Sequence, residues 1–143
     1  MSAWVDGEEQ DILELWFAGT ALPLSATHIG LFTTNPNDAG SGGTEATGGS
    51  YVREAFARND TNWGNSSAGA PSSIESLLDL TFTEATASWG TIVGWGYFTA
   101  SSGGTLLYWA ALGASKVIDT DDTARFLAGT LLAELGDPGD GYT

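Results

Sequence analysis

The chain has 143 residues, which suits one ordinary domain whose core buries roughly two-thirds of the unfolded chain's surface. Its 42% hydrophobic and 11% aromatic content, with six Trp, excludes a disordered chain, because such chains lack the apolar surface that offsets ordering entropy. Eighteen Asp and Glu against four Lys and Arg give a formal net charge of -14, which repels phosphate backbones and anionic lipid, so neither nucleic acid nor a membrane is an expected partner.

The chain contains no Cys, so the sequence predicts neither a disulfide framework nor a zinc site of the Cys type. No apolar run approaches the roughly 20 residues of a membrane-spanning helix. The first residues lack the basic region and the continuous apolar region of a secretory signal. We therefore expect a soluble protein that is made and kept in a cytoplasm.

One helix is predicted, over residues 6–19. Asp6 is placed as the N-cap with Glu9 three residues later, a variant of the capping box, and Gly19 is the stop signal. The apolar residues cluster on a broad stripe and the charged residues take the remaining surface. One side of the helix is expected to dock and the other to face water. The stripe consists of Ile12, Leu13, Leu15, Trp16 and Phe17.

After the helix the sequence favours strands separated by polar loops. Residues 27–33 form the first predicted strand, and the Gly-rich residues 35–50 form a long surface loop. Residues 51–58 are predicted as a strand, with a helix as the weaker alternative. A second polar loop over 59–73 carries Trp63. A half-buried strand over 77–83 then places Leu78, Leu80 and Phe82 on one face.

The second half of the chain holds the most apolar strands. Residues 87–100 combine Trp, Tyr and Phe with glycines that mark bends or close backbone approach, and residues 105–112 are apolar on both faces. The turn at 101–104 should join them as a central hairpin. A short strand and acidic turn follow at 115–122, and a strand at 123–135, for which a helix over 131–135 is the alternative.

This order of elements predicts a mainly β fold with one short N-terminal helix. Several short strands, Gly-rich turns and no βαβ rhythm indicate an antiparallel sandwich, a jelly-roll-like fold or a partly open barrel. We expect a single domain over 1–143, with an N-terminal arm and helix at 1–22, a β body at 23–135 and a loose or partner-held tail at 136–143.

The sequence offers no convincing catalytic or cofactor site. The single His, His28, has no Cys partner and no Gly-x-Ser-x-Gly motif to work with. Asp119 and Asp122 in the acidic turn could supply oxygen ligands for Ca²⁺, but the spacing does not match an EF-hand loop. We therefore expect no catalytic residue, no cofactor and no metal site, with Ca²⁺ at the acidic turn left as an alternative.

The aromatic residues are the better candidates for binding. Trp95 and Trp109 lie in predicted strands and should be structural, whereas Trp4 and the loop residue Trp63 are better placed to contact a partner, because Trp is enriched at interface hot spots and at sugar-stacking surfaces. The full set of interface candidates is Trp4, Trp16, Phe17, Tyr51, Arg53 and Trp63.

Several short motifs follow one another along the chain. The most distinctive are Leu-Phe-Thr-x-x-Pro at 31–36 and Gly-Gly-x-Tyr-x-Arg at 48–53, followed by weaker motifs at 82–91, 103–107 and 126–131. Together with the opening helix, these motifs resemble a family of small structural proteins of tailed phages. Its members are labelled tail fibre or virion protein, and some are capsid decoration, or cement, proteins. The resemblance covers nearly the whole chain.

The resemblance implies a non-enzymatic structural protein of the virion, made in the host bacterial cytoplasm. The first hypothesis is a capsid decoration protein that binds the major capsid protein as a homotrimer and stabilises the outside of the head. The alternative is a tail fibre or minor tail protein, with a glycan-binding module for host recognition as one form of it. A small glycan hydrolase ranks third, because no carboxylate pair stands out among the eighteen acids. Copy number per virion separates the first two hypotheses.

Overall fold

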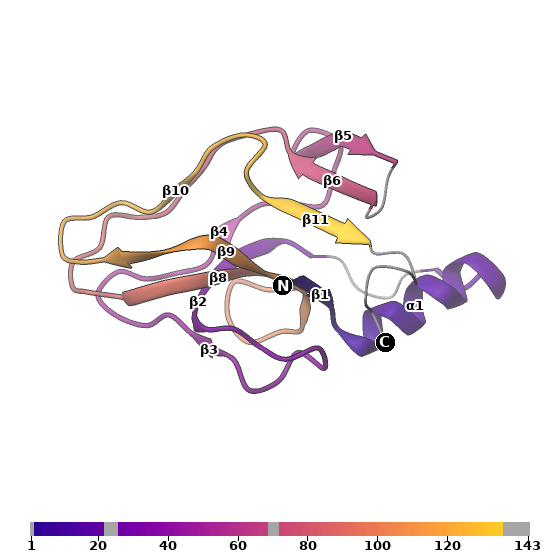
Figure 1. Cartoon of the computed structure of the whole chain (residues 1–143), viewed down its shortest axis with the longest axis horizontal. Coiled ribbons are helices and arrows are strands. Elements are labelled where there is room, and N and C mark those ends of the chain that lie inside the picture. Colours follow the sequence, from indigo (N-terminus) through magenta and orange to yellow (C-terminus); the bar gives the residue numbers. More distant parts are fainter. Residues whose placement is uncertain (1, 22–25, 69–71, 136–143) are drawn as a thin grey trace.

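The computed structural model describes residues 2–21, 26–68 and 72–135, so the predicted tail at 136–143 lies outside the described residues. Its largest element is a six-stranded antiparallel sheet with the order β1-β9-β8-β2-β3, in which β4 also pairs with β2 (Figure 1). The sheet curls into half a barrel. The strands are β1 (Ser2–Trp4), β2 (His28–Thr34), β3 (Thr44–Glu45), β4 (Glu54–Ala55), β8 (Gly90–Phe98) and β9 (Leu106–Ile118).

Two smaller sheets complete the described part of the chain. Strand β7 (Leu80–Thr81) pairs with β10 (Arg125–Phe126), and β6 (Ser72–Ser76) lies between β5 (Trp63–Ser67) and β11 (Leu132–Leu135). All of these pairings are antiparallel. The prediction of a mainly β fold, as a sandwich or partly open barrel with one helix, is therefore confirmed.

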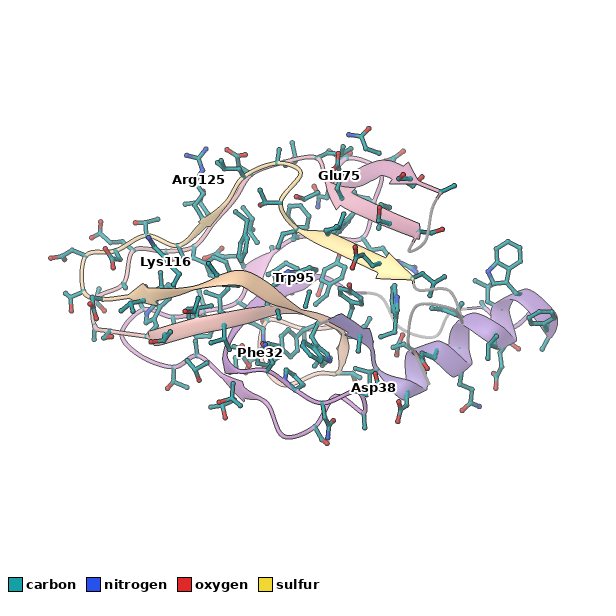
Figure 2. The ribbon with its side chains drawn as sticks, viewed as in Figure 1. Phe32, Asp38, Glu75, Trp95, Lys116 and Arg125 are labelled. Carbon is teal, nitrogen blue, oxygen red and sulfur yellow. The ribbon has the colours of Figure 1, made fainter. Side chains whose placement is uncertain are left out.

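The central hairpin of β8 and β9 is confirmed and buries apolar side chains on both of its faces. Trp95 and Tyr108 belong to the main core, which extends under the two smaller sheets. Phe98 and Trp109 belong to a second core, which Phe32 of β2 completes on the opposite face. Figure 2 shows Trp95 and Phe32 on opposite sides of the central sheet. Trp95 and Trp109 are thus structural, as the sequence predicted.

Several predictions about individual segments are wrong in detail. The segment 51–58 contributes only the two residues of β4, and the predicted loop at 59–73 contains the whole of β5 and the first residues of β6. Of 77–83 only Leu80–Thr81 is a strand, and Leu78 is 46% exposed because the chain bends there. The helical alternative for 131–135 is also wrong, because Leu132–Leu135 pairs with β6. Residues up to Ile118 extend β9 and form no separate strand.

Helix α1 (Asp6–Phe17) forms as predicted but does not dock. Its N-cap is Val5 and makes no side-chain cap, so Asp6 is the first helical residue. Gly19, with φ of 70°, follows the C-cap Ala18 as a left-handed stop residue, and the Thr20 amide donates to the Glu14 carbonyl. None of the helical residues is buried. The apolar stripe has no surface to cover it in the described chain, because α1 projects from β1 at one end of the molecule (Figure 1).

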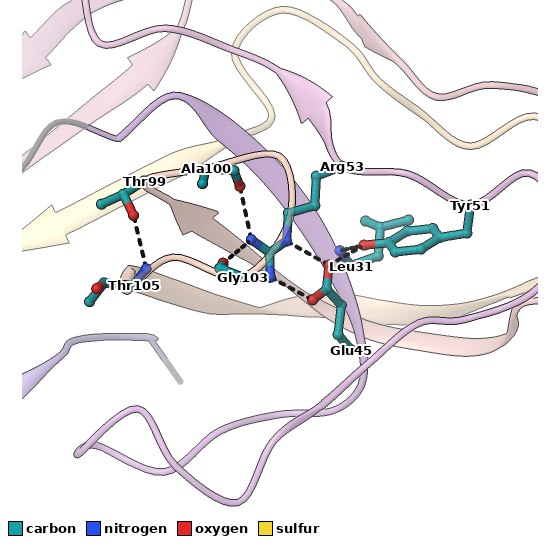
Figure 3. Close-up of polar contacts among 8 residues, drawn as sticks. All are labelled: Leu31, Glu45, Tyr51, Arg53, Thr99, Ala100, Gly103 and Thr105. Atoms are coloured by element: carbon teal, nitrogen blue, oxygen red, sulfur yellow. Dashed lines mark hydrogen bonds and ion pairs between the residues drawn. The ribbon is translucent and has the colours of Figure 1, made fainter.

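A polar cluster fixes the long loop between β2 and β4 to the central sheet. The Arg53 guanidinium donates two hydrogen bonds to the Glu45 carboxylate, of 2.8 and 2.7 Å, and two more to the Ala100 and Gly103 carbonyls (Figure 3). Its central carbon lies 3.5 Å from the ring centroid of Phe98. Because the Arg53 side chain is only 8% exposed, this ion pair is shielded from water and holds the 101–104 turn against β3.

The Tyr51 hydroxyl fills a gap along the edge of β2. It accepts a hydrogen bond of 2.8 Å from the Leu31 amide and donates one of 3.0 Å to Glu45 (Figure 3). Strands β3 and β4 pair with β2 on either side of this point, so the hydroxyl replaces a missing backbone partner. Burial raises the pKa of Tyr51 well above its usual range. The phenol therefore stays neutral and serves as a fixed link in the sheet edge.

The first prediction concerns Gly96 on the second core's side of β8. A Cβ there would lie 2.6 Å from the Phe32 ring and 2.7 Å from the Leu106 side chain. We expect Gly96→Ala to lower the free energy of unfolding by about 1–3 kcal/mol through overpacking. Gly113→Ala on β9 is the matched control, because nothing lies within 4 Å of its Cβ position. Urea unfolding followed by Trp fluorescence measures both, and equal midpoints would contradict the packing argument.

The second prediction tests the hydroxyl at the sheet edge. Tyr51→Phe keeps the ring against Phe82 and Trp89 but leaves the Leu31 amide without its partner. We expect the free energy of unfolding to fall by about 1–3 kcal/mol, the usual result of stranding a buried donor. Thr33→Val is the control, because it removes only a long, exposed hydrogen bond of 3.3 Å to the Thr44 carbonyl. Equal losses in the two variants would show that the edge does not depend on Tyr51.

Candidate functional site

The interface candidates from the sequence fall into two groups. Tyr51 and Arg53 direct their polar atoms into the cluster of Figure 3, where Leu31, Glu45 and two carbonyls of the 101–104 turn region occupy them. Their described contacts are thus internal. Trp4, Trp16, Phe17 and Trp63 lie elsewhere, around a pocket and on helix α1. Whether any of the six contacts a partner stays a prediction.

Trp63 is not the exposed loop residue that the sequence indicated. It opens strand β5, is only 8% exposed and packs edge-on against Phe56, with 5.2 Å between the ring centroids. Its indole N–H donates a 3.0 Å hydrogen bond to the Tyr97 hydroxyl, which in turn donates one of 2.7 Å to the Phe56 carbonyl. Burial raises the pKa of Tyr97 to about 12. Because the residues around Trp63 are polar, nothing in the sequence indicated that Trp63 anchors the sheet of β5, β6 and β11 to the core.

Trp4 links the N-terminal strand to the last one. Its indole N–H donates a 3.1 Å hydrogen bond to the Glu134 carbonyl, and its ring meets Tyr108 edge-on at a centroid distance of 5.1 Å. The Tyr108 hydroxyl accepts a 3.0 Å hydrogen bond from the Glu134 amide. Trp4 and Tyr108 therefore fix β11 beside β1 and β9, with the half-buried Trp4 ring reaching the surface.

The rings of Trp4, Trp63, Tyr97 and Tyr108 line one pocket, which we call the aromatic pocket. It has a volume of about 420 Å³ and lies where the central sheet meets the sheet of β5, β6 and β11. The indole N–H groups of Trp4 and Trp63 and the hydroxyl of Tyr97 donate to protein partners. Trp63 and Tyr108 are buried, so the half-buried rings of Trp4 and Tyr97 are the aromatic surfaces left for an occupant. The pocket is lined by Trp4, Arg58, Asn59, Asp60, Trp63, Ile74, Tyr97, Tyr108 and Ala133.

Helix α1 presents a second unusual surface. Trp16 is 79% exposed and Phe17 is 87% exposed, and Leu13 lies on the same side three residues before Trp16. We call Leu13, Trp16 and Phe17 the α1 stripe. Large apolar side chains gathered on one exposed face are typical of a surface that another molecule covers. The rest of the helix is acidic, with five carboxylates at Asp6, Glu8, Glu9, Asp11 and Glu14 and no basic residue.

The other polar residues that the sequence singled out make local contacts in the described part of the chain. The His28 ring contacts the Thr27 hydroxyl at 2.8 Å in β2. In the acidic turn, Asp122 accepts a hydrogen bond from the Asp119 amide and Asp119 accepts one from Ser88. Within the described ranges no three His, Asp or Glu side chains gather as metal ligands. The Ca²⁺ alternative for this turn therefore gains no support from the geometry.

Sequence reasoning missed Arg58, Tyr97 and Tyr108 as pocket residues. The lining comes from β1, β5, β6, β8, β9, β11 and the segment before β5, most of which are far apart in the sequence. Neither spacing nor composition indicates that such residues meet. The only available signal was the number of Trp residues, and it pointed to Trp4 and Trp63 without showing that they share a pocket.

The comparisons with known proteins agree with the motifs. A family model described as the podophage GP4 fiber I protein gp80 matches residues 2–134, which include α1, the aromatic pocket and both cores. No curated protein matches the chain. Among the described residues no helix is long and apolar enough to cross a membrane. The resemblance to small phage structural proteins is confirmed, and the chain belongs to the family of the podophage GP4 fiber I protein gp80, a family of phage fibre proteins.

Proposed function

We propose that this protein is a non-enzymatic structural subunit of a phage fibre and that it assembles with copies of itself through helix α1. The observation that carries the proposal is the α1 stripe. A lone chain would expose the Trp16 and Phe17 rings to water, although burying one such ring stabilises a protein by roughly 1.5–3 kcal/mol. An assembly that covers the stripe recovers this free energy.

The description of the family is one support for the fibre role. Its printed description names a fibre protein, and the match extends over the helix as well as the β body. A decoration protein bound to the major capsid protein as a trimer is the competing account, and it makes a different prediction about abundance. The charge of -14 fits either role, because an acidic outer surface keeps particles dispersed.

Glycan recognition on Trp63 is not part of this proposal. Sugar stacking needs an exposed ring face beside free amides or acids, whereas Trp63 is buried and its N–H is bonded to Tyr97.

Enzymatic activity is not part of the proposed function either. The described residues offer no cluster with a nucleophile, a base and an orienting group, and the acids are spread over an exposed surface.

The third prediction concerns copy number. In purified virions, quantitative mass spectrometry of this protein against the major capsid protein should give a ratio far below one, close to that of other tail components. Fibres are present in a handful of copies, whereas decoration proteins follow the capsid lattice. A ratio of order one to the capsid subunit would overturn the fibre role and restore the decoration hypothesis.

The fourth prediction concerns the α1 stripe. Trp16→Ser with Phe17→Ser should convert an assembled protein to monomers, because removing one hot-spot ring costs about 2 kcal/mol or more and weakens association roughly 30-fold or more. Val117→Ser is the control, since Val117 is half exposed on β9, far along the hairpin from α1. Sedimentation velocity over a concentration series measures both. Equal sedimentation of the double variant and the original protein would show that assembly does not use the stripe.

A further inference from the structure

We propose that the aromatic pocket receives the α1 stripe of a second copy of this chain, so that the helix of each copy enters the pocket of the next. This inference rests on the proposed assembly through α1 and adds the surface that accepts the helix. Two features of the described chain carry it. Among the described residues, the pocket is an apolar hollow that no side chain fills, and the stripe is an apolar projection that none of them covers.

The chemistry of the pocket selects an apolar ring. The Trp4 and Trp63 indoles and the Tyr97 hydroxyl donate their hydrogens to protein partners. The half-buried rings of Trp4 and Tyr97, with Ile74 and Ala133, are left as the apolar surface that an occupant can contact. Aromatic pairs in edge-to-face geometry add about 0.5–1.5 kcal/mol beyond area burial. The volume of about 420 Å³ falls within the range of roughly 300–1,000 Å³ of pockets that hold small organic groups. One large aromatic side chain with a neighbour fits this space.

The helix of the same chain does not reach its own pocket. Trp4 in the pocket wall is followed at once by Val5 and α1, which carries Phe17 eleven residues beyond Asp6. At 1.5 Å per residue, the stripe ends about 16 Å from the start of the helix. Figure 1 shows α1 extending away from the sheets of β9 and β11. The stripe therefore points toward a neighbour.

Charge supports the same partner. Arg53 pairs with Glu45 and Arg125 with Asp79, whereas Arg58 and Lys116 form no ion pair in the described part of the chain. Of these two, Arg58 stands exposed at the aromatic pocket. Asp60 also lines the pocket but is not bonded to Arg58. The incoming helix brings five carboxylates and no base. In a chain of charge -14, the exposed Arg58 offers the acidic helix an opposite charge at the pocket.

This contact joins two different surfaces, so it generates head-to-tail assemblies. Such interfaces close into rings when the rotation between copies allows it and form open filaments when it does not. In a closed ring every α1 stripe would be covered and every aromatic pocket would be filled. It would also place the α1 helices around the contacts between copies, with each β body facing outward.

A charge reversal tests the pocket side of the contact. Arg58→Glu should raise the dissociation constant of self-association at least roughly tenfold, because the acidic helix then meets a like charge. Lys116→Glu is matched in charge change, and Figure 2 places Lys116 at the end of the molecule opposite α1, so it should change the constant by less than about threefold. Near-ultraviolet circular dichroism confirms that both variants keep their packing. Equal effects of the two variants would overturn the proposal.

Cysteine cross-linking identifies the surface that the helix meets, because the chain has no Cys of its own. Ala18→Cys beside the stripe and Asn59→Cys at the pocket are made as separate chains, mixed and oxidised. We expect disulfide-linked pairs in the mixture and little linkage in either variant alone or with Lys116→Cys. Linkage of Ala18→Cys with itself, without the mixed product, would show helices packing on each other. That result would overturn the pocket inference while leaving assembly through α1 intact. No linkage in any mixture of a monomeric protein would overturn both.

Discussion

The pairing of β8 with β9 is the interaction on which the remaining structure depends. These two strands form the centre of the largest sheet, with β2 on one side and β1 on the other. Both of their faces are apolar, so each face needs its own cover. The two smaller sheets cover the face of Trp95 and Tyr108. The long loop after β2 approaches the other face, where the Trp109 indole donates a hydrogen bond to the Asn37 carbonyl.

The loop that follows β2 needs a fixed position because it has little regular structure of its own. Between residues 35 and 53 only the two residues of β3 are strand. The Glu45–Arg53 ion pair, the Tyr51 hydroxyl and the absence of a side chain at Gly30 let the loop close on the sheet. A Cβ at Gly30 would lie 2.9 Å from the Glu45 carboxylate and 2.9 Å from the Phe98 ring. The Gly-Gly-x-Tyr-x-Arg motif therefore has a structural reason.

The β body and the helix differ in how far their large apolar side chains are buried within the same chain. In the body the large rings are buried and their polar atoms are bonded. Helix α1 has no buried residue, and its largest side chains lie in water. A fold selected for stability as a lone chain has no use for such a helix, whereas a subunit of an assembly does. The aromatic pocket, beside the strand that leads into α1, is the surface that we propose accepts the helix of another copy.

The sequence by itself determined the features that depend on near neighbours. Helix α1 follows from the spacing of its apolar residues and from Gly19, the hairpin follows from two apolar runs around a Gly-rich turn, and the excess of acid is independent of the fold. The family follows from the sequence too, because each of its motifs is a short run of adjacent residues and their order is the order of the chain.

Only the tertiary structure decided which polar segments pair and which rings meet. Residues around Trp63 resemble a loop because Gly, Asn and Ser dominate them. They form β5 nonetheless, because β6 pairs with them and β11, near the far end of the chain, pairs with β6. Tyr51 and Arg53 became internal because Glu45 and the 101–104 turn converge on them. The aromatic pocket combines Trp4 with Ala133, nearly the full length of the chain apart. Contacts at such separations depend on how whole sheets pack, and no local pattern in a sequence records that.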